Sequence, residues 1–276
     1  MSLKLFEKNI QSQFGEDGVI EEIFKRINAT DKICVEFGAW DGVYLSNTWN
    51  LWHNEDWFAY LIEGNKEKAK LLEENLSSFP KIKALNAFVA PEGDFSLDVI
   101  LSKYPIPQNF DLLSIDIDGD DYYIFKNLNN FKPKLIIIEF NPTVPQHIEM
   151  VQEIGEYMGA SALSMINLAK QKGYKPIHIT EVNLFFIRDE IFQLGLFDEL
   201  DLEKQFNKSH LVNVITTFDG ITFLSSHLPY KPELPLKEKI NLKSALKTLL
   251  NTTGQSKVEP KFTSSNSLIP VDIFKK

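Results

Sequence analysis

The sequence has a single cysteine and fewer basic than acidic side chains. Cys34 therefore has no partner for an intramolecular disulfide, and its place in the apolar run 33–35 indicates a buried structural thiol. The 276 residues include 29 Lys and Arg against 38 Asp and Glu, which gives a formal net charge of -9. Because nucleic-acid binding depends on Lys and Arg that neutralise phosphates, we expect no nucleic-acid partner.

Long apolar runs are also missing. The N-terminal residues contain no signal-peptide core, and the apolar run 57–62 is far shorter than the roughly 20 residues of a membrane span. Only 13 glycines and 13 prolines are present and 43% of the residues are hydrophobic, so disordered and fibrous classes are excluded. We expect a folded, cytoplasmic protein without a membrane span.

Short apolar runs alternate with segments of helical composition along the first half of the chain. Parallel strands that are covered on both faces form such continuous runs, bounded by turn residues. The expected strands are 33–37, 58–62, 84–89, 112–117 and 135–140, and the expected helices are 17–28, 66–76 and 122–128. This order predicts an α/β fold built from βαβ units with five parallel strands.

Two further strands are expected after a helix over 151–173, which Gly173 would end. These strands are the β-rich runs 177–180 and 183–187. The few residues between them leave no room for a crossover helix, so the two runs should pair antiparallel.

The character of the sequence changes after residue 190. We expect a hairpin in which Asp219-Gly220 joins the runs 214–218 and 221–224, then a helix near 236–250 and a proline-containing extended arm. The chain is therefore divided into a domain over 1–190 and a C-terminal extension over 191–276. We assign a lid or an oligomerisation role to this extension.

The most informative segment is Val35-Glu36-Phe37-Gly38-Ala39-Trp40-Asp41-Gly42, at the end of the first expected strand. The strand ends in an acid and turns through small residues toward Ser46, so that backbone could approach a ligand closely. The same turn could equally serve only to link strand to helix. The second strand ends in Glu63, near the spacing at which Rossmann-like folds place an acid on a ribose. A nucleoside-containing cofactor is therefore expected.

The loop distinguishes between two such cofactors by what it lacks. A dinucleotide loop needs three close glycines so that a pyrophosphate can lie against a helix N-terminus, and the third glycine is missing. Glu36 and Asp41 also place negative charge there. S-adenosylmethionine has no phosphate and carries a sulfonium and an ammonium group, which carboxylates attract. The sequence therefore favours S-adenosylmethionine over NAD.

A second group of acids follows the fourth and fifth expected strands. Asp116 and Asp118 lie on one face of a strand end, and Glu139 ends the neighbouring strand. If these strands adjoin, the three carboxylates meet and need either bound protons or a hard cation such as Mg²⁺ or Mn²⁺. The alternative is a solvated acidic loop in which Asp120 or Asp121 caps the next helix.

Together these motifs resemble those of the FkbM-type class I methyltransferases, many of which O-methylate sugars or other small hydroxyl compounds. The resemblance covers about residues 10–190. It rests on Ser12-Gln13-Phe14-Gly15-Glu16-Asp17, the 36–42 loop, Glu63, Asp116-Ile117-Asp118-Gly119, Lys132-Pro133-Lys134 and Glu139-Phe140-Asn141. It implies a Rossmann-like class I fold with a mixed seven-stranded sheet and helices on both faces.

The resemblance also assigns roles to single residues. It implies that S-adenosylmethionine is bound by Glu36, Gly38, Ala39, Asp41 and Glu63, and also by Gln13, Asp17 and Ser46. The family commonly has Glu at the second acid of its acid-x-acid-Gly motif, where this chain has Asp118.

On the acceptor side we expect Asp116, Asp118 and Glu139, acting jointly on a proton or as ligands of Mg²⁺ or Mn²⁺. His147 is a candidate general base because it lies in the loop after the fifth expected strand.

The expected reaction is transfer of a methyl group from S-adenosylmethionine to a hydroxyl of a sugar, nucleotide sugar or glycan-type small molecule. Two alternatives remain open. One is an NAD-linked sugar-modifying enzyme, and the other is a catalytically inactive Rossmann-like binding module that acts through its C-terminal extension. The extension is also the candidate surface for a homo-oligomer.

Overall fold

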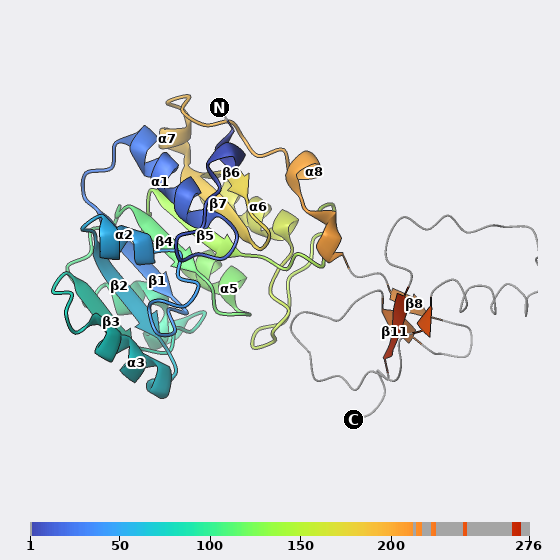
Figure 1. The fold of residues 1–276 in the computed structure, drawn as a ribbon, viewed down its shortest axis with the longest axis horizontal. Helices are drawn as coiled ribbons and strands as arrows, with labels where there is room; N and C mark the ends of the chain where they lie inside the picture. The colour runs from blue at the N-terminus through green and yellow to red at the C-terminus, as the bar shows by residue number, and fades with distance from the viewer. Residues whose placement is uncertain (1, 212–213, 217–221, 225–239, 242–266, 272–276) are drawn as a thin grey trace, which may run out of the picture. The chain divides into compact units, whose positions relative to one another are not determined.

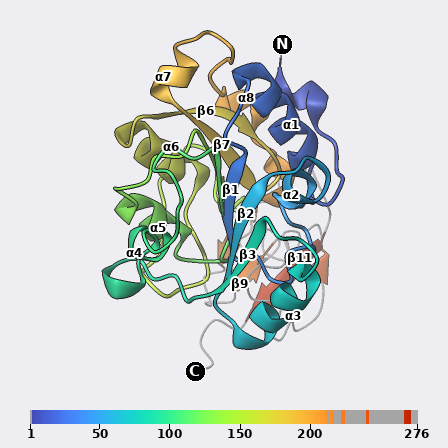
Figure 2. The ribbon, with the colours of Figure 1, turned by 90° about the vertical axis from the view of Figure 1, so that its left-hand side faces the viewer.

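The computed structural model describes residues 2–211, 214–216, 222–224, 240–241 and 267–271. The chain divides into two compact units, 1–208 and 209–276, which are treated separately below. The first unit contains a seven-stranded sheet with helices on both faces (Figure 1). Figure 2 shows α1, α2 and α3 on one side of this sheet and α4, α5 and α6 on the other.

The elements of the first unit alternate as the apolar runs predict. Its strands are β1 (Ile33–Phe37), β2 (Phe58–Glu63), β3 (Ile82–Asn86), β4 (Leu112–Ile115), β5 (Leu135–Glu139), β6 (Tyr174–Ile179) and β7 (Asn183–Arg188). Its α-helices are α1 (Glu16–Ile27), α2 (Trp49–Asn54), α3 (Lys66–Leu76), α4 (Leu97–Leu101), α5 (Asp121–Asn127), α6 (Ala162–Gln171), α7 (Asp189–Phe192) and α8 (Leu202–Gln205). Short 3-10 helices cover Leu3–Phe6, Gly93–Phe95 and, across the unit boundary, Lys208–His210.

The strand order is β3-β2-β1-β4-β5-β7-β6. The first five strands are parallel, whereas β7 runs antiparallel to both β5 and β6. This arrangement confirms the predicted Rossmann-like α/β fold with a mixed seven-stranded sheet. Because β7 runs opposite to its neighbour β5, it begins at the edge where the parallel strands end.

The central strands lie in the core. All residues of β4 and the first four of β5 are buried, as expected for apolar strands with helices on both faces. Cys34 in β1 is fully buried, in agreement with its reading as a structural thiol.

Several sequence-based boundaries are wrong. The fourth strand ends at Ile115 rather than at 117, so Asp116 and Asp118 lie in the loop after it, and the sixth strand begins at Tyr174 rather than at 177. The third strand covers Ile82–Asn86 and so begins and ends earlier than the expected 84–89. The helix expected over 151–173 is confined to α6, because a β-bridge joins Val151 to Ala160 and closes the preceding residues into a loop. The Ser161 hydroxyl then accepts a hydrogen bond from the Ser164 N–H and caps the helix there.

The segment after β7 packs on the sheet unit. Phe197, Leu200 and Phe206 are buried, and the Phe206 ring lies 6.1 Å from the Phe140 ring. The domain boundary after residue 190 and the lid or oligomer role of residues 191–276 stay predictions.

The second unit contains β8 (Val214–Thr216), β9 (Thr222–Leu224), β10 (Ile240–Asn241) and β11 (Ser267–Val271), in the order β10-β11-β9-β8. The pair β8 and β9 is antiparallel, as the hairpin predicts, while its Asp219-Gly220 turn lies outside the described residues. Most of the helix expected near 236–250 also lies outside them, and Ile240–Asn241 within that range is a strand instead.

Candidate functional site

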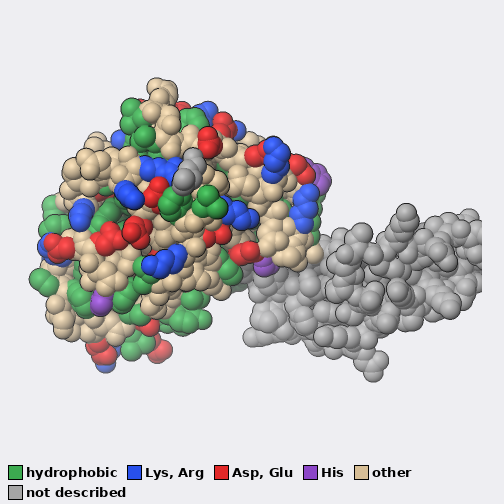
Figure 3. All heavy atoms as spheres, turned by 45° about the horizontal axis from the view of Figure 1, so that its top comes forward, with side chains coloured by type: hydrophobic (Ala, Val, Ile, Leu, Met, Phe, Trp, Pro, Cys, Tyr) green, Lys and Arg blue, Asp and Glu red, His purple; other side chains and the backbone are tan. Residues whose placement is uncertain are grey.

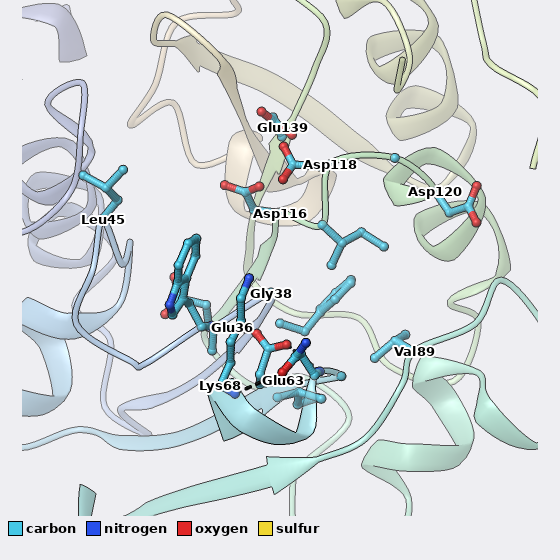
Figure 4. A pocket seen from close by; sticks show the side chains of 18 of the residues that line it. Glu36, Gly38, Leu45, Glu63, Lys68, Val89, Asp116, Asp118, Asp120 and Glu139 are labelled. Atoms are coloured by element: carbon cyan, nitrogen blue, oxygen red, sulfur yellow. Dashed lines mark hydrogen bonds between the residues drawn. The ribbon is translucent and has the colours of Figure 1, made fainter. Parts of the chain in front are cut away.

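A cavity of about 670 Å³ lies at the carboxyl ends of the parallel strands. The loops that follow β1, β2, β3, β4 and β5 line it, together with the turn before α1 and the start of β7. Figure 4 shows Glu63 on one side of it and Asp116, Asp118 and Glu139 on the other. Open α/β sheets bind their ligands at this edge.

The loop after β1 passes directly against the end of β4. Gly38 has a φ of 78°, and a Cβ atom added there would lie 1.6 Å from the carbonyl oxygen of Asp116. Only glycine therefore fits at this position. The loop then pairs with β2 through a hydrogen bond of 3.1 Å from the Ala39 N–H to the Ile62 carbonyl.

Glu36 is buried under this loop and organises the segment before α2. Its carboxylate accepts hydrogen bonds from the Ser46 hydroxyl (2.6 Å), the Thr48 hydroxyl (2.7 Å) and the Asn47 N–H (2.9 Å). Burial raises the pKa of Glu36 in spite of these three donors. Glu36 and Ser46 both line the cavity, and the carboxylate fixes the wall that they form.

Glu63 stands at the end of β2 and is also buried. One carboxylate oxygen accepts the Trp40 N–H at 2.9 Å, and the other accepts the Asn65 N–H at 2.7 Å. Each carboxylate oxygen can accept a further hydrogen bond, so two hydroxyl groups in the cavity could still be bound. Beside it, the Lys68 ammonium lies 3.7 Å from the centre of the Trp40 ring.

The turn before α1 is held by two buried acids. One oxygen of Asp17 accepts the N–H groups of residues 10, 11 and 12 within 2.8 Å, and Asp17 itself does not line the cavity. Glu16 accepts hydrogen bonds from the Thr180 hydroxyl (2.7 Å) and the Asn183 amide (3.2 Å). These contacts fix the turn that brings Gln13 to the cavity wall.

Asp41 has a similar supporting position. Its carboxylate accepts the Val43 N–H at 2.9 Å and the Tyr44 N–H at 2.7 Å, and it is not among the residues that line the cavity. Gly38, Ala39 and the other cofactor residues expected from the sequence do line it. The cofactor contacts of all these residues stay predictions.

The structure brings the three expected acceptor-side acids together. Carboxylate oxygens of Asp116, Asp118 and Glu139 all lie within 4.8 Å of one another. Burial, followed by the charges of Asp121 and Asp118, raises the pKa of Asp116 well above its ordinary value. Asp118 has a φ of 55°, a conformation that a residue with a side chain rarely adopts.

Asp121 explains how this conformation is held. Its carboxylate accepts hydrogen bonds from the Ile117 N–H (3.0 Å) and the Gly119 N–H (2.9 Å), so it fastens the loop that carries Asp118. Burial raises the pKa of Asp121 to about 6. Asp121 therefore supports the loop from within, and Asp120, at the N-cap of α5, makes no capping hydrogen bond with its side chain, so the structure does not show the expected helix cap.

His147 lies apart from this cluster. Its side chain is exposed and is not among the residues that line the cavity. The pKa of nearby Glu203 is lowered mainly by hydrogen bonds from Gln146 and Lys208, and His147 contributes the least. Its role as a general base stays a prediction.

The cavity is strongly acidic. Seven of its described lining residues are Asp or Glu, and Lys68 is the single Lys or Arg among them. By contrast, Lys and Arg lie interspersed with Asp and Glu on the face shown in Figure 3. Such a lining attracts a cationic ligand and repels phosphate groups. The positively charged sulfonium and ammonium groups of S-adenosylmethionine fit this acidic lining.

Comparison with known protein families gives a match within the chain. Residues 91–176 match the family model of the methyltransferase FkbM domain. Over these residues the chain is similar to the FkbM methyltransferase domain. Its predicted class, an S-adenosylmethionine-dependent methyltransferase, is confirmed by this match. No curated protein matches the chain.

Several solved structures resemble the chain at low sequence identity. The CMeT domain of the citrinin polyketide synthase has a TM-score of 0.42 and 13% identity, covering 63% of this chain and 51% of its own. An S-adenosylmethionine-dependent methyltransferase from Aquifex aeolicus has a TM-score of 0.40 and 12% identity, covering 67% and 95%. The mitomycin 7-O-methyltransferase MmcR has a TM-score of 0.34 and 16% identity, covering 61% and 53%. The chain thus spans about half the length of the first and third of these structures.

No helix among the described residues is both long and apolar enough to cross a membrane.

Sequence reasoning missed several residues that line the cavity of the FkbM-type domain. Asn183 is one of them, and the antiparallel pair could have indicated it, because a strand running opposite to β5 must begin at the cavity edge. Lys68 follows the end of β2 closely and could have been found from its place in the first turn of α3. Glu156 and Tyr157 were hidden by the incorrect helix over 151–173.

Proposed function

We propose that this FkbM-type domain transfers the methyl group of S-adenosylmethionine to a hydroxyl group of a sugar or glycan-type small molecule. The observation that carries the proposal is the pairing, in one cavity, of Glu63 with an opposing cluster of three carboxylates. The Glu63 carboxylate can accept further hydrogen bonds, and it lies at the strand end where Rossmann-like folds bind ribose hydroxyls. The three carboxylates provide proton acceptors on the opposite side of the same cavity.

Glu63, the loop after β1 and Gln13 would hold the cofactor. Glu63 would accept hydrogen bonds from the two ribose hydroxyls, while its contacts with the Trp40 and Asn65 N–H groups keep the carboxylate oriented. When bound, S-adenosylmethionine supplies an electrophilic methyl group on a cationic sulfur. The acidic lining favours that cation and disfavours the pyrophosphate of NAD, which supports the methyltransferase over the NAD-linked alternative.

Asp116 is the group best suited to receive the proton of the acceptor hydroxyl. Its raised pKa makes the carboxylate a stronger base than an ordinary aspartate. Asp118 and Glu139 lie near enough to accept hydrogen bonds from neighbouring hydroxyls and so orient the acceptor for attack. His147 is exposed away from the cavity lining, and the acids are the better-supported base.

The same three acids could instead hold Mg²⁺ or Mn²⁺. Carboxylate oxygens are the ligands that these cations prefer, and a separation within 4.8 Å allows all three to reach one ion. A cation held there would neutralise the cluster and lower the pKa of a hydroxyl bound to it. Turnover that is lost in EDTA and restored by Mg²⁺ or Mn²⁺ would support this version. Full activity in EDTA would exclude it.

The charge of the lining also ranks the acceptors. With Lys68 as the single Lys or Arg among the described lining residues, a nucleotide sugar would bring its phosphates against several carboxylates. A neutral sugar avoids this repulsion. We therefore place uncharged sugars and glycans ahead of nucleotide sugars.

The test combines cofactor binding with product formation. Calorimetry should show binding of S-adenosylmethionine and S-adenosylhomocysteine and no binding of NAD. Release of S-adenosylhomocysteine should then be measured with neutral glycosides, nucleotide sugars and phenols, using Asp116→Asn/Asp118→Asn as the inactive control. Binding of NAD in place of S-adenosylmethionine would contradict the proposal. Cofactor binding without methyl transfer to any hydroxyl compound would support the inactive binding module.

A further inference from the structure

The loop between β5 and α6 forms one side of the cavity mouth. Gly155, Glu156 and Tyr157 line the cavity, in the segment that the sequence suggested would be helical. The bridge between Val151 and Ala160 closes this segment into a compact loop. We refer to residues 152–159 as the mouth loop.

Gln152 connects the two ends of the mouth loop. It is 6% exposed, and its amide N–H₂ group donates to the Glu156 carbonyl at 2.5 Å and to the Asp120 carboxylate at 3.3 Å. Its amide oxygen accepts the Gly159 N–H, and its backbone carbonyl accepts the Tyr123 hydroxyl at 2.6 Å. A single buried side chain thus fixes the shape of the loop.

The mouth loop rests on the turn that carries the acceptor-side acids. A Cβ atom on Gly119 would lie 2.7 Å from the Glu156 carbonyl oxygen, so the two backbones are in direct contact. One residue further, the Asp120 carboxylate accepts the Gly155 N–H at 2.9 Å. Since Asp118 immediately precedes this turn, the loop and the acidic cluster keep a fixed relative position.

Tyr157 is the side chain that this arrangement presents to a ligand. Tyr157 is 63% exposed and lines the cavity, whereas Ile154 in the same loop is 58% exposed and does not line it. An exposed aromatic side chain that lines the same cavity as a group of carboxylates is suited to a sugar, because the C–H face of a pyranose can pack on the ring while its hydroxyls bind the acids. A tyrosine has only two side-chain torsion angles, so it provides a large contact area for a small loss of conformational entropy.

We propose that the mouth loop is the acceptor-recognition element, in which Tyr157 stacks on the pyranose ring of an uncharged glycoside and Gln152 is the positioning residue. The inference rests on the proposed methyl transfer, since it assigns the acceptor of that same cavity.

The first experiment measures glycoside binding to the full-length protein saturated with S-adenosylhomocysteine. The probes are methyl α-glycosides of glucose, mannose, galactose and rhamnose, titrated by calorimetry. For the tightest probe, Tyr157→Ala should raise the dissociation constant about five- to tenfold, and Tyr157→Phe should change it by less than about twofold. Ile154→Ala is the matched control and should leave it unchanged.

The second experiment tests Gln152 through Gln152→Met, which keeps the size of the side chain and removes its side-chain hydrogen bonds, while the backbone carbonyl can still accept the Tyr123 hydroxyl. The expected result is a rise of about tenfold in the KM for the glycoside with an unchanged dissociation constant for S-adenosylmethionine. A purely structural role would weaken cofactor binding and thermal stability together with KM.

The outcomes separate this inference from the proposed function. If S-adenosylhomocysteine binds but none of the glycosides does, or if Tyr157→Ala and Ile154→Ala act alike, the recognition role of the mouth loop is wrong. A protein that does not bind S-adenosylhomocysteine overturns the proposed function itself.

Discussion

Gly38 and Asp116 are in contact through backbone alone: a Cβ atom on Gly38 would lie 1.6 Å from the Asp116 carbonyl oxygen. Gly38→Ala must therefore displace the loop after β1 from the end of β4. We expect it to lower the free energy of unfolding by roughly 3 to 5 kcal/mol and to abolish S-adenosylmethionine binding. Urea unfolding and calorimetry would measure the two effects.

Gly93 provides the control for this prediction. It also has a positive φ, of 81°, but nothing lies within 4 Å of an added Cβ atom. Gly93→Ala should therefore cost only about 1 kcal/mol, from backbone strain. Equal losses for the two variants would show that the contact with Asp116 is unimportant.

Glu63→Gln tests the ribose contact. Replacing a carboxylate oxygen by an amide removes charge-assisted acceptor capacity beside the Trp40 and Asn65 N–H groups. The dissociation constant of S-adenosylmethionine should rise about 30-fold, equivalent to roughly 2 kcal/mol. Glu73→Gln, on the exposed side of α3, is the matched control. Unchanged affinity in Glu63→Gln would contradict a ribose-binding role.

The raised pKa of Asp116 predicts opposite effects of pH on activity and stability. As pH rises and Asp116 loses its proton, kcat/KM should increase, because only the carboxylate can accept a proton from the acceptor. The folded state binds that proton more tightly than the unfolded chain, so the free energy of unfolding should fall over the same rise.

Asp116→Asn should remove this limb of the pH profile and lower turnover by about 100-fold. It should also flatten the pH dependence of stability relative to the unchanged protein. The exposed Asp94→Asn serves as the control. A pH profile that Asp116→Asn leaves intact would show that another group takes the proton.

Asp17 and Gln13 should respond differently to substitution. Asp17→Asn weakens the buried acceptor that collects the N–H groups of residues 10–12, and should destabilise the fold by about 2 kcal/mol. Gln13→Ala changes an exposed side chain in the cavity wall and should alter stability by less than about 0.5 kcal/mol while weakening cofactor binding. Thermal unfolding would measure stability and calorimetry would measure cofactor binding for both variants. A stable Asp17→Asn variant, or an unchanged cofactor affinity in Gln13→Ala, would contradict these roles.

The sheet could be predicted because its strands are apolar and short. Apolar runs such as 112–117 and 135–140 are typical of strands buried between two helical layers, and the helical segments between the runs indicate parallel crossovers. The helix over 151–173 could not be separated into loop and helix in the same way. The conformation of residues 151–161 depends on the side-chain hydrogen bonds of Gln152 and on the bridge between Val151 and Ala160, and no local sequence pattern indicates these contacts.

The site was predictable to the extent that strand ends determine it. Glu36, Glu63 and Asp116 each follow an apolar run, so topology places them at one edge. Asp17 and Asp41 fall within the same motifs but turn toward the backbone of their own loops. Sequence spacing cannot distinguish an acid that faces a ligand from one that collects N–H groups.

The hydrogen bond from Asn183 to Glu16 joins residues that stand 167 positions apart. During synthesis, α1 leaves the ribosome long before β7 is made, so Glu16 cannot yet accept the hydrogen bond from Asn183. An N-terminal fragment therefore has no finished binding pocket, and the cofactor cannot assist early steps of folding. Contacts of such long range also slow folding, so the nascent chain passes through a period in which the α1 end is open to chaperones and proteases.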